Sequence, residues 1–551
     1  MAEKGKRPKA KVHRSNAKLE KIVIFLVFVV VVIVGAGIYY KKSQEPAEKY
    51  EFEGNVISEN QEETLEKEHS YSVSTSNDIA TAVGMSVLEK GGNAVDAAIA
   101  VAYTLGVVEP YASGIGGSGG MLVYNMKTEE CEFFDYRASS GDLDYSYDNI
   151  AVPGFVAGME AAHEAYGTIA MADLIEPAVQ YAENGFEIYG SLGYRINSAV
   201  AYIEKYSMFY DEKGNWVETG DMLYQEDLAE TLRAIQDGGA EVFYKGYIAE
   251  DIAENTSLSK EDIANYKVLK GDVAQGTFEG YTVYGAGAPL SGTTLVQMLE
   301  MADSVDIVDP TEDVNKYVEQ LGKITNSAYA SRYKYITDPS LYEVDEEYLT
   351  SEEHIEYLLS ANDLEYADEE ESMETTSFSI VDSNGLAVSC TNTLSDFWGS
   401  RVKVDGIFLN DTNVNFSEGI NKYEPNKRSR TFTSPTIVVG DDGYVMAIGT
   451  PGGSSIPCLL FNVIVDVLKF DMDPQEAIDK SIVICKRDVL YVEADKNGET
   501  WLDTSKLQKN FVWQNTGAWW GCVSFAGYSD EAGAFAAYDF RRGATMAGVS
   551  K

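Results

Sequence analysis

The stretch Thr375–Leu394 reads TTSFSIVDSNGLAVSCTNTL, and it decides how the residues around it fold. Apolar and polar side chains alternate over Ser377–Val381, which is typical of a strand with one buried face. Asn384-Gly385 then turns the chain and Leu386–Thr391 returns, so the stretch predicts a β-hairpin. The acidic run Asn362–Glu374 comes directly before it and predicts a solvated loop. A threonine, Thr375, therefore stands where an exposed loop becomes a strand.

Patterns upstream of this hairpin are mainly helical, and a second hairpin follows downstream. Asn77 is a good N-cap and Gly91-Gly92 comes after Lys90, so a helix is expected between them. Other expected helices are Ala94–Thr104, Ala161–Gly167, Ala172–Gly185 and one opened by a Ser259–Asp262 capping box. Expected strands are Met121–Asn125 and Tyr281–Tyr284, with the second hairpin at Thr436–Val439 and Tyr444–Ile448. The order predicts an α+β fold of stacked helix and sheet layers.

The N-terminus carries a different pattern. Residues 22–40 form a 19-residue run without charge, IVIFLVFVVVVIVGAGIYY, about 28 Å long as a helix and close to the thickness of a bilayer core. Eight basic residues precede it and only Lys41 and Lys42 follow. By the positive-inside rule, residues 1–21 are a cytoplasmic basic tail, 22–40 a transmembrane signal anchor, and 41–68 an acidic stalk that carries an extracellular domain. A cleaved signal peptide is the alternative, although its apolar region would be unusually long.

Composition restricts the class of protein. The 551 residues are 45% hydrophobic and have a formal net charge of −45, and 33 basic residues face 86 acidic ones after Lys42. No basic surface is expected to neutralise phosphates, so nucleic acid is an improbable partner. Five scattered cysteines form no C-x-x-C pair, and the four histidines, His13, His69, His163 and His354, do not cluster, so neither a metal site nor another cofactor is expected.

The scarcity of histidine also limits the possible nucleophiles. Gly116–Gly120 matches G-x-S-x-G around Ser118, but an α/β-hydrolase needs a late histidine, and no histidine follows His354. A tight glycine turn is the simpler interpretation. A threonine at a newly made N-terminus can instead use its own α-amino group as the base, since the pKa of that group is about 7.7–8.0. Thr375 has the required context, as do other threonines that begin strands.

Motifs along residues 70–545 resemble those of the gamma-glutamyltransferase family, also called gamma-glutamyltranspeptidases or glutathione hydrolases, which are N-terminal-nucleophile (Ntn) hydrolases. The motifs, in family order, are GGNAVDAAIAVAYTLGVVEP (91–110), SGIGGSGGMLVYN (113–125), FDYR (134–137), VPGFVAGMEAAHEAYG (152–167), FYKGYIAEDIA (243–253), TTSFSIVDSNGLAVSCTNTL (375–394), GIFLND (406–411), KRSRTFTSPTIVV (427–439) and GTPGGSSI (449–456).

This resemblance implies a four-layer αββα sandwich, cut between Glu374 and Thr375 into a large subunit (69–374) and a small catalytic subunit (375–551) that stay together as a heterodimer. Thr375 would then form an acyl-enzyme with a γ-glutamyl substrate and pass the group to water or an amine. Thr393 matches the threonine that bonds the nucleophile, and Gly452-Gly453 match the oxyanion-hole pair. Arg137 matches the arginine that binds the substrate α-carboxylate, with a surface salt bridge as the alternative role.

Departures from the family pattern gather where the substrate is recognised. Thr375-Thr376-Ser377 stands where TTH is usual. Ser395, Thr412 and Asn415 occupy the positions of an amide, a Gln or Glu, and an Asp that hold the α-ammonium. Thr431-Phe432 replaces a serine pair that contacts the α-carboxylate. Each lost charge-assisted bond removes about 1.5–3 kcal/mol.

Three interpretations of the chain's function follow. The default is a self-processing enzyme acting on glutathione-type substrates. The second is an enzyme of the same family that acts on poly-γ-glutamate or a wall-peptide amide, which would suit the altered α-amino positions. Capsule-anchoring relatives of the family act on such polymers. The third is a catalytically silent surface homologue. The retained Thr375, Thr393 and Gly452-Gly453 argue against it.

Overall fold

The structure is a computed structural model that describes residues 70–143, 146–361, 364, 374–441, 443–514, 521–542 and 546–549. These residues all belong to one compact unit, Thr64–Lys551. Within them, no helix combines the length and apolar character needed to span a bilayer. The described residues do not include the predicted tail, anchor and stalk (1–68). Of the predicted acidic loop 362–374, they include only Leu364 and the strand residue Glu374.

A seven-stranded sheet carries the hairpin that begins at Thr375. Its order is β20-β1-β9-β10-β2-β3-β6, and every neighbouring pair is antiparallel. The predicted hairpin is therefore confirmed and lies at the centre of the sheet, where both of its faces are covered. The strands are β1 (Ser72–Thr75), β2 (Ser118–Asn125), β3 (Glu130–Tyr136), β6 (Leu269–Gly271), β9 (Glu374–Val381), β10 (Leu386–Ser395) and β20 (Met546–Val549).

A second, six-stranded sheet packs against one face of the first, through contacts of β14 and β18 with β9 and β10. It contains the second predicted hairpin, β13–β14. Its order is β19-β18-β14-β13-β8-β7: β7 (Val273–Phe278), β8 (Tyr281–Ala286), β13 (Thr436–Val439), β14 (Val445–Gly449), β18 (Ser524–Ser529) and β19 (Gly533–Ala537). Smaller sheets join β15 (Ile482–Lys486), β16 (Val489–Glu493) and β17 (Phe511–Gln514); β4 (Phe186–Glu187) and β5 (Met222–Leu223); and β11 (Lys403–Val404) and β12 (Ile407–Phe408).

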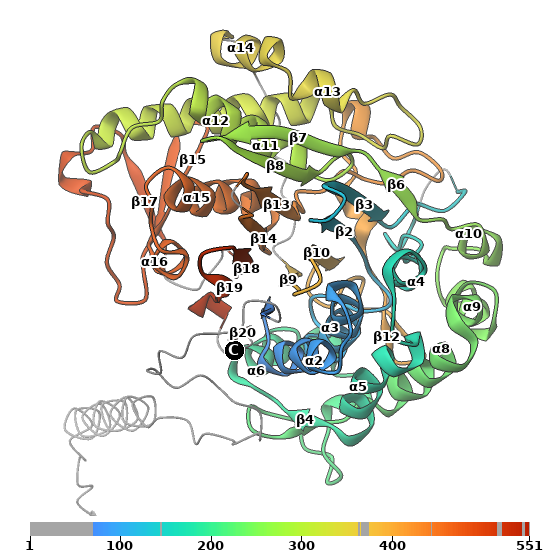
Figure 1. Cartoon of the computed structure of the whole chain (residues 1–551). Coiled ribbons are helices and arrows are strands. Elements are labelled where there is room, and N and C mark those ends of the chain that lie inside the picture. The colour runs from blue at the N-terminus through green and yellow to red at the C-terminus, as the bar shows by residue number, and fades with distance from the viewer. Residues whose placement is uncertain are drawn as a thin grey trace, which may run out of the picture. The chain divides into compact units, whose positions relative to one another are not determined.

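Helices cover the outer faces of both sheets, so the described unit has the layers α, β, β and α (Figure 1). α2 (Asp78–Glu89) and α3 (Ala94–Val108) pack on the seven-stranded sheet. α11 (Gly292–Ser304) packs on the six-stranded sheet and against α12 (Val314–Tyr335) and α15 (Ile456–Leu468). The other helices are α4 (Phe155–Tyr166), α5 (Met171–Asn184), α6 (Gly190–Ser198), α7 (Val200–Ile203), α8 (Glu226–Tyr244), α9 (Tyr247–Asn255), α10 (Lys260–Ala264), α13 (Glu346–Leu349), α14 (Glu352–Ser360) and α16 (Pro474–Asp479).

Several predicted boundaries shift for local physical reasons. Asn77 caps α2, and Ser259 with Asp262 forms the capping box of α10, as predicted. The strand predicted at Met121–Asn125 begins three residues earlier, at Ser118, because Gly119 and Gly120 pair with β10 and β3. The helix predicted from Ala161 starts at Phe155, because its first turn is apolar and buried instead of amphipathic.

Candidate active site

Thr375 lies at the start of β9 with its side chain enclosed, 3% exposed. Its Oγ1 donates to Oγ1 of Thr393 at 3.4 Å. The same Thr393 oxygen accepts the main-chain N–H of Ser395 at 2.8 Å. The sequence-predicted pair, Thr375 and Thr393, is therefore brought together by the pairing of β9 with β10.

The end of β10 holds an unusual backbone. The register shifts between Asn392 and Ser395, and Ser395 has φ 82°. Trp398 and Arg401 also have positive φ, 65° and 62°. Such backbone in side-chain-bearing residues costs of order 1–3 kcal/mol each and persists only where neighbouring contacts fix it. Here the N–H of Trp398 donates to Tyr111 at 2.8 Å, and the enclosed indole packs edge-on against Phe209.

Ser395, Thr412 and Asn415 lie together, as predicted for one binding region. Asn415 Nδ2 donates to Ser395 Oγ at 3.1 Å, and Thr412 and Asn415 open and close a single 3₁₀ turn, η3 (Thr412–Asn415). All three side chains are uncharged, so this region offers hydroxyl and amide groups to a ligand. The adjacent Asp411 is bonded to the N–H of Asp396; burial, together with the neighbouring Asp396 carboxylate, raises its pKa to about 7.

Arg137 is 1% exposed, so its alternative role as a surface salt bridge is excluded. Its Nε and Nη2 donate to the carbonyl and hydroxyl of Ser429, both at 3.2 Å. Ser429 Oγ also donates to the carbonyl of Thr412 at 3.3 Å. A hydrogen-bonded path therefore connects the guanidinium to η3, and Asn415 of η3 bonds Ser395 beside Thr393.

Gly452 and Gly453 form the turn that follows β14. They have φ 142° and 53°, a region that suits glycine. A Cβ at Gly452 would lie 2.9 Å from Leu459 Cδ1, so the turn is packed closely as well as being left-handed. β14 ends beside β9: Ser524 Oγ donates to the carbonyl of Gly449 and lies 3.3 Å from Ser377 Oγ. The turn thus begins next to the first residues of β9.

Thr431 and Phe432 are buried and fixed by packing. The Thr431 N–H donates to Pro289, and its carbonyl accepts from Ser291. The Phe432 ring lies 3.6 Å from the Arg332 guanidinium and 5.4 Å from the Tyr329 ring. These contacts pack Phe432 against α12, and its side chain has no hydroxyl to offer a carboxylate.

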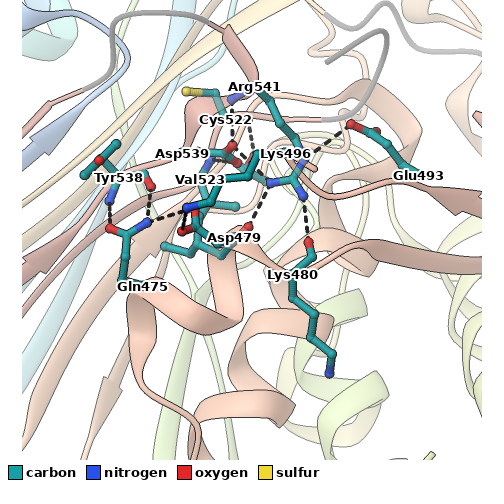
Figure 2. A network of polar contacts seen from close by, with 12 residues as sticks. Gln475, Asp479, Lys480, Glu493, Lys496, Cys522, Val523, Tyr538, Asp539 and Arg541 are labelled. Carbon is teal, nitrogen blue, oxygen red and sulfur yellow. Dashed lines mark hydrogen bonds and ion pairs between the residues drawn. The ribbon is translucent and has the colours of Figure 1, made fainter. Parts of the chain in front are cut away.

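Arg542 is a site residue that the sequence analysis missed. Its Nη1 donates to the main-chain carbonyl of Thr375 at 3.0 Å. The preceding Arg541 anchors this segment: its guanidinium meets Glu493 at 3.3 Å and Asp539 at 3.0 Å and donates to the carbonyl of Lys480, as Figure 2 shows. The sequence around Arg542, Tyr538–Arg542, gave no signal because Arg542 is 167 residues away from Thr375 in the chain.

Ser118 is not a hydrolase nucleophile elbow. It begins β2 and pairs directly with Thr393 inside the antiparallel sheet, whereas an elbow requires a sharp turn from a strand into a helix.

A buried threonine at the start of a central strand, in a sandwich of two sheets between helical layers, defines the class of Ntn hydrolases. Solved structures bear out this fold: the cephalosporin acylase from Bacillus halodurans superposes with a TM-score of 0.77, covering 91% of this chain and 99% of that one, at 21% identity.

The family follows from sequence comparison. The family model described as gamma-glutamyltranspeptidase matches residues 80–549. The capsule biosynthesis protein CapD proenzyme of Bacillus anthracis is 40% identical, with 82% of this chain and 86% of the relative covered. The glutathione hydrolase proenzyme of Bacillus subtilis is 30% identical, with 74% and 79% covered. The chain belongs to the gamma-glutamyltranspeptidase family of enzymes.

Proposed function

We propose that the chain is an enzyme precursor that cuts itself between Glu374 and Thr375 and then transfers or hydrolyses γ-glutamyl groups on Thr375. The observation that carries this proposal is the buried Thr375–Thr393 hydroxyl pair at the start of β9. The retained subunits, 69–374 and 375–551, would form one heterodimer, because β9 and β10 lie between β1 and β2 of the large subunit.

Processing is an acyl shift followed by hydrolysis. Thr375 Oγ1 attacks the carbonyl carbon of Glu374, the peptide C–N bond breaks, and the nitrogen takes up a proton to become the α-amino group of Thr375. Water then cleaves the ester, which leaves the Glu374 carboxylate and a free threonine hydroxyl.

Turnover reuses the same oxygen. The α-amino group of Thr375 takes the Oγ1 proton while Oγ1 attacks the γ-carbonyl of the donor. The N–H groups of Gly452 and Gly453 stabilise the resulting oxyanion, worth about 3–4 kcal/mol per donor in comparable sites. The leaving amine takes the proton, and water or an acceptor amine then resolves the acyl-enzyme. Arg137 would bind the α-carboxylate with a paired guanidinium bond.

The donor is the second part of the proposal. Glutathione-type substrates are the family default, but Ser395, Thr412 and Asn415 present no carboxylate to an α-ammonium. This favours a donor whose glutamyl nitrogen is already in an amide, as in poly-γ-glutamate or a wall peptide. The higher identity to a relative named for capsule biosynthesis, 40% against 30% for the glutathione hydrolase, points the same way.

The test compares donors on the solubilised full-length protein. Poly-γ-glutamate and glutathione are offered separately, and the release of new amines is measured. Faster turnover of the polymer is expected, whereas clearly faster turnover of glutathione would return the chain to the default activity.

A denaturing gel separates an enzyme from a silent homologue. The wild-type chain should give two bands and Thr375→Ala one band. A single full-length band from the folded wild type would favour the silent protein.

The membrane anchor completes the proposal. Residues 22–40 would hold the chain as a single-pass protein with its catalytic unit outside the cell, supported by the charge asymmetry around the apolar run. Protease added to intact cells should remove the catalytic unit and spare the tail. Recovery of soluble protein beginning after residue 40 would instead indicate a cleaved signal.

A further inference from the structure

A lysine lies at the N-terminal end of the helix that follows the oxyanion turn. Gly452-Gly453 lead through the 3₁₀ turn η5 (Gly453–Ser455) into α15. Lys486, the last residue of β15, reaches this point from the neighbouring sheet. Its Nζ donates to Ser454 Oγ at 3.0 Å and to Ser455 Oγ at 3.1 Å.

This placement works against the helix. The amide dipoles of a helix put partial positive charge at its N-terminus, so a cation there is unfavourable. Ser455 is the N-cap residue of α15, yet its side chain makes no capping hydrogen bond and accepts from Lys486 instead. A serine at this position ordinarily accepts from the first helical N–H groups. Ser455 has helical backbone angles, φ −95° and ψ −10°, and Pro457 in the first turn has no N–H to offer, so the Ser455 hydroxyl accepts from the cation beside the turn.

The charge of Lys486 acts on a residue inside the helix. Burial raises the pKa of the Cys458 thiol, in the first turn of α15, and the Lys486 cation opposes that rise. The positive potential of the lysine and that of the helix N-terminus therefore add in the same region, next to Gly452 and Gly453.

Neighbouring contacts hold the Gly452–Ser455 turn in place. Tyr329 Oη donates to the carbonyl of Ser454 at 2.5 Å, and its ring lies 5.7 Å from Lys486 Nζ. On the other side, a Cβ at Gly452 would lie 3.6 Å from the main-chain nitrogen of Gly521. A rigid turn holds its N–H groups where charge develops, without reorganisation during the reaction.

We infer that Lys486 is a positioning residue that stabilises the oxyanion of the acyl-transfer reaction, acting through Ser454, Ser455 and the Gly452-Gly453 turn. Negative charge at the turn exists only in the tetrahedral intermediate and its transition states. Lys486 therefore lowers the barrier and leaves the binding of the uncharged γ-carbonyl unchanged. The inference rests on the proposed γ-glutamyl activity of Thr375.

The same helix supplies a matched control. Lys469 is the C-cap residue of α15, where a cation suits the helix dipole, and it pairs with Glu279 at 2.5 Å and Asp306 at 3.0 Å. Lys469→Met and Lys486→Met remove the same charge from opposite ends. The first should lower the melting temperature without changing kcat, and the second should lower kcat with little change in melting temperature.

Turnover of a chromogenic Nα-acyl-γ-glutamyl anilide, whose glutamyl nitrogen is in an amide as in the proposed donor, is measured per processed chain, counted from the two gel bands. Lys486→Met should lose at least about tenfold in kcat with KM changed less than about twofold, and Lys486→Arg should recover most of the loss. The Nα-acylated glutamate analogue with a boronic acid in place of the γ-carboxyl forms an anionic tetrahedral adduct with Thr375. Its affinity for Lys486→Met should fall by the same factor as kcat/KM.

Each other outcome counts against the inference. A rise in KM at constant kcat would make Lys486 a ground-state contact to the donor. Equal losses from Met and Arg, or a fall in kcat that tracks the melting temperature, would make its role structural. If the wild type neither cuts itself nor turns over the anilide or the polymer, the proposed function is wrong. The wild-type protein alone shows this, so it is distinguished from a failure of the Lys486 inference.

Discussion

Thr393→Val should remove the two hydrogen bonds that meet on one oxygen. Valine keeps the shape of threonine but cannot accept the Thr375 hydroxyl at 3.4 Å or the Ser395 N–H at 2.8 Å. The second loss leaves a buried donor without a partner, which costs about 1–3 kcal/mol. It also releases Ser395, whose φ of 82° needs such contacts to persist. If the same free energy orients Thr375, both processing and turnover should slow by about 5- to 150-fold.

The assay follows the two gel bands with time after synthesis and then the burst and steady release from a chromogenic anilide. Thr391→Val is the matched control, because Thr391 is also buried on β10 and lies 3.4 Å from Ser377 Oγ, away from the nucleophile. It should lose comparable stability and keep its rates. Thr393→Ser should stay near wild type. Wild-type rates in Thr393→Val would refute the assignment of Thr393 as the partner of the nucleophile.

Three further changes test two other parts of the site and one buried carboxyl group. Arg542→Met removes the charge-assisted bond to the Thr375 carbonyl and should slow processing about tenfold or more, measured by gel, with Arg542→Lys intermediate. Burial raises the pKa of Glu109 to about 7 from 4.5, so the folded state holds a proton that the unfolded state releases. Stability should therefore fall as the pH rises from about 4.5 through about 7, by at most roughly 3 kcal/mol, and Glu109→Gln should flatten this loss in thermal melts. Gly452→Ala should abolish turnover, since its Cβ meets Leu459 at 2.9 Å, while Gly498→Ala, also at positive φ but in open space, should cost only modest stability.

Local pattern was enough to predict the hairpins and the starts of the helices that have a capping residue. The β9–β10 hairpin follows from alternation around Asn384-Gly385, and α2 follows from the cap at Asn77, because both depend on neighbours in sequence. Nothing local predicts that β1 pairs with β9 on one side and with the edge strand β20 on the other. Such pairing joins segments from opposite ends of the described chain, so it depends on the complete tertiary structure.

In the site, too, some residues could be predicted from the sequence and others could not. Thr375, Thr393 and Arg137 were found because family motifs mark them. The sequence could not show that Arg137 is enclosed against Ser429 instead of lying at the surface. Arg542 and Lys486 lie outside the quoted motifs, and both reach the site from strands and turns distant in sequence. Their roles depend on electrostatics in three dimensions.

Ser377 is the departure from the family pattern that the structure explains most directly. It is fully enclosed between the two sheets, donates to the carbonyl of Cys390 at 3.2 Å and lies 3.3 Å from Ser524 Oγ. A Cβ added at Gly449 would lie only 2.2 Å from its hydroxyl oxygen. This space holds a serine and no larger side chain.

Ser377→His, which restores the usual family residue, should therefore impair processing in this chain. Overpacking a closed interior costs about 1–3 kcal/mol or more and would push β9 away from β14, moving Thr375 relative to Gly452-Gly453. Ser377→Ala removes the hydroxyl without adding bulk and should process nearly normally. Ser524→Ala combined with Ser377→His should recover part of the loss, because it removes a side-chain oxygen that lies 3.3 Å from the Ser377 hydroxyl. Normal processing in Ser377→His alone would show that the layer between the sheets yields to a larger side chain, and the reason for serine at this position would then have to lie in the substrate.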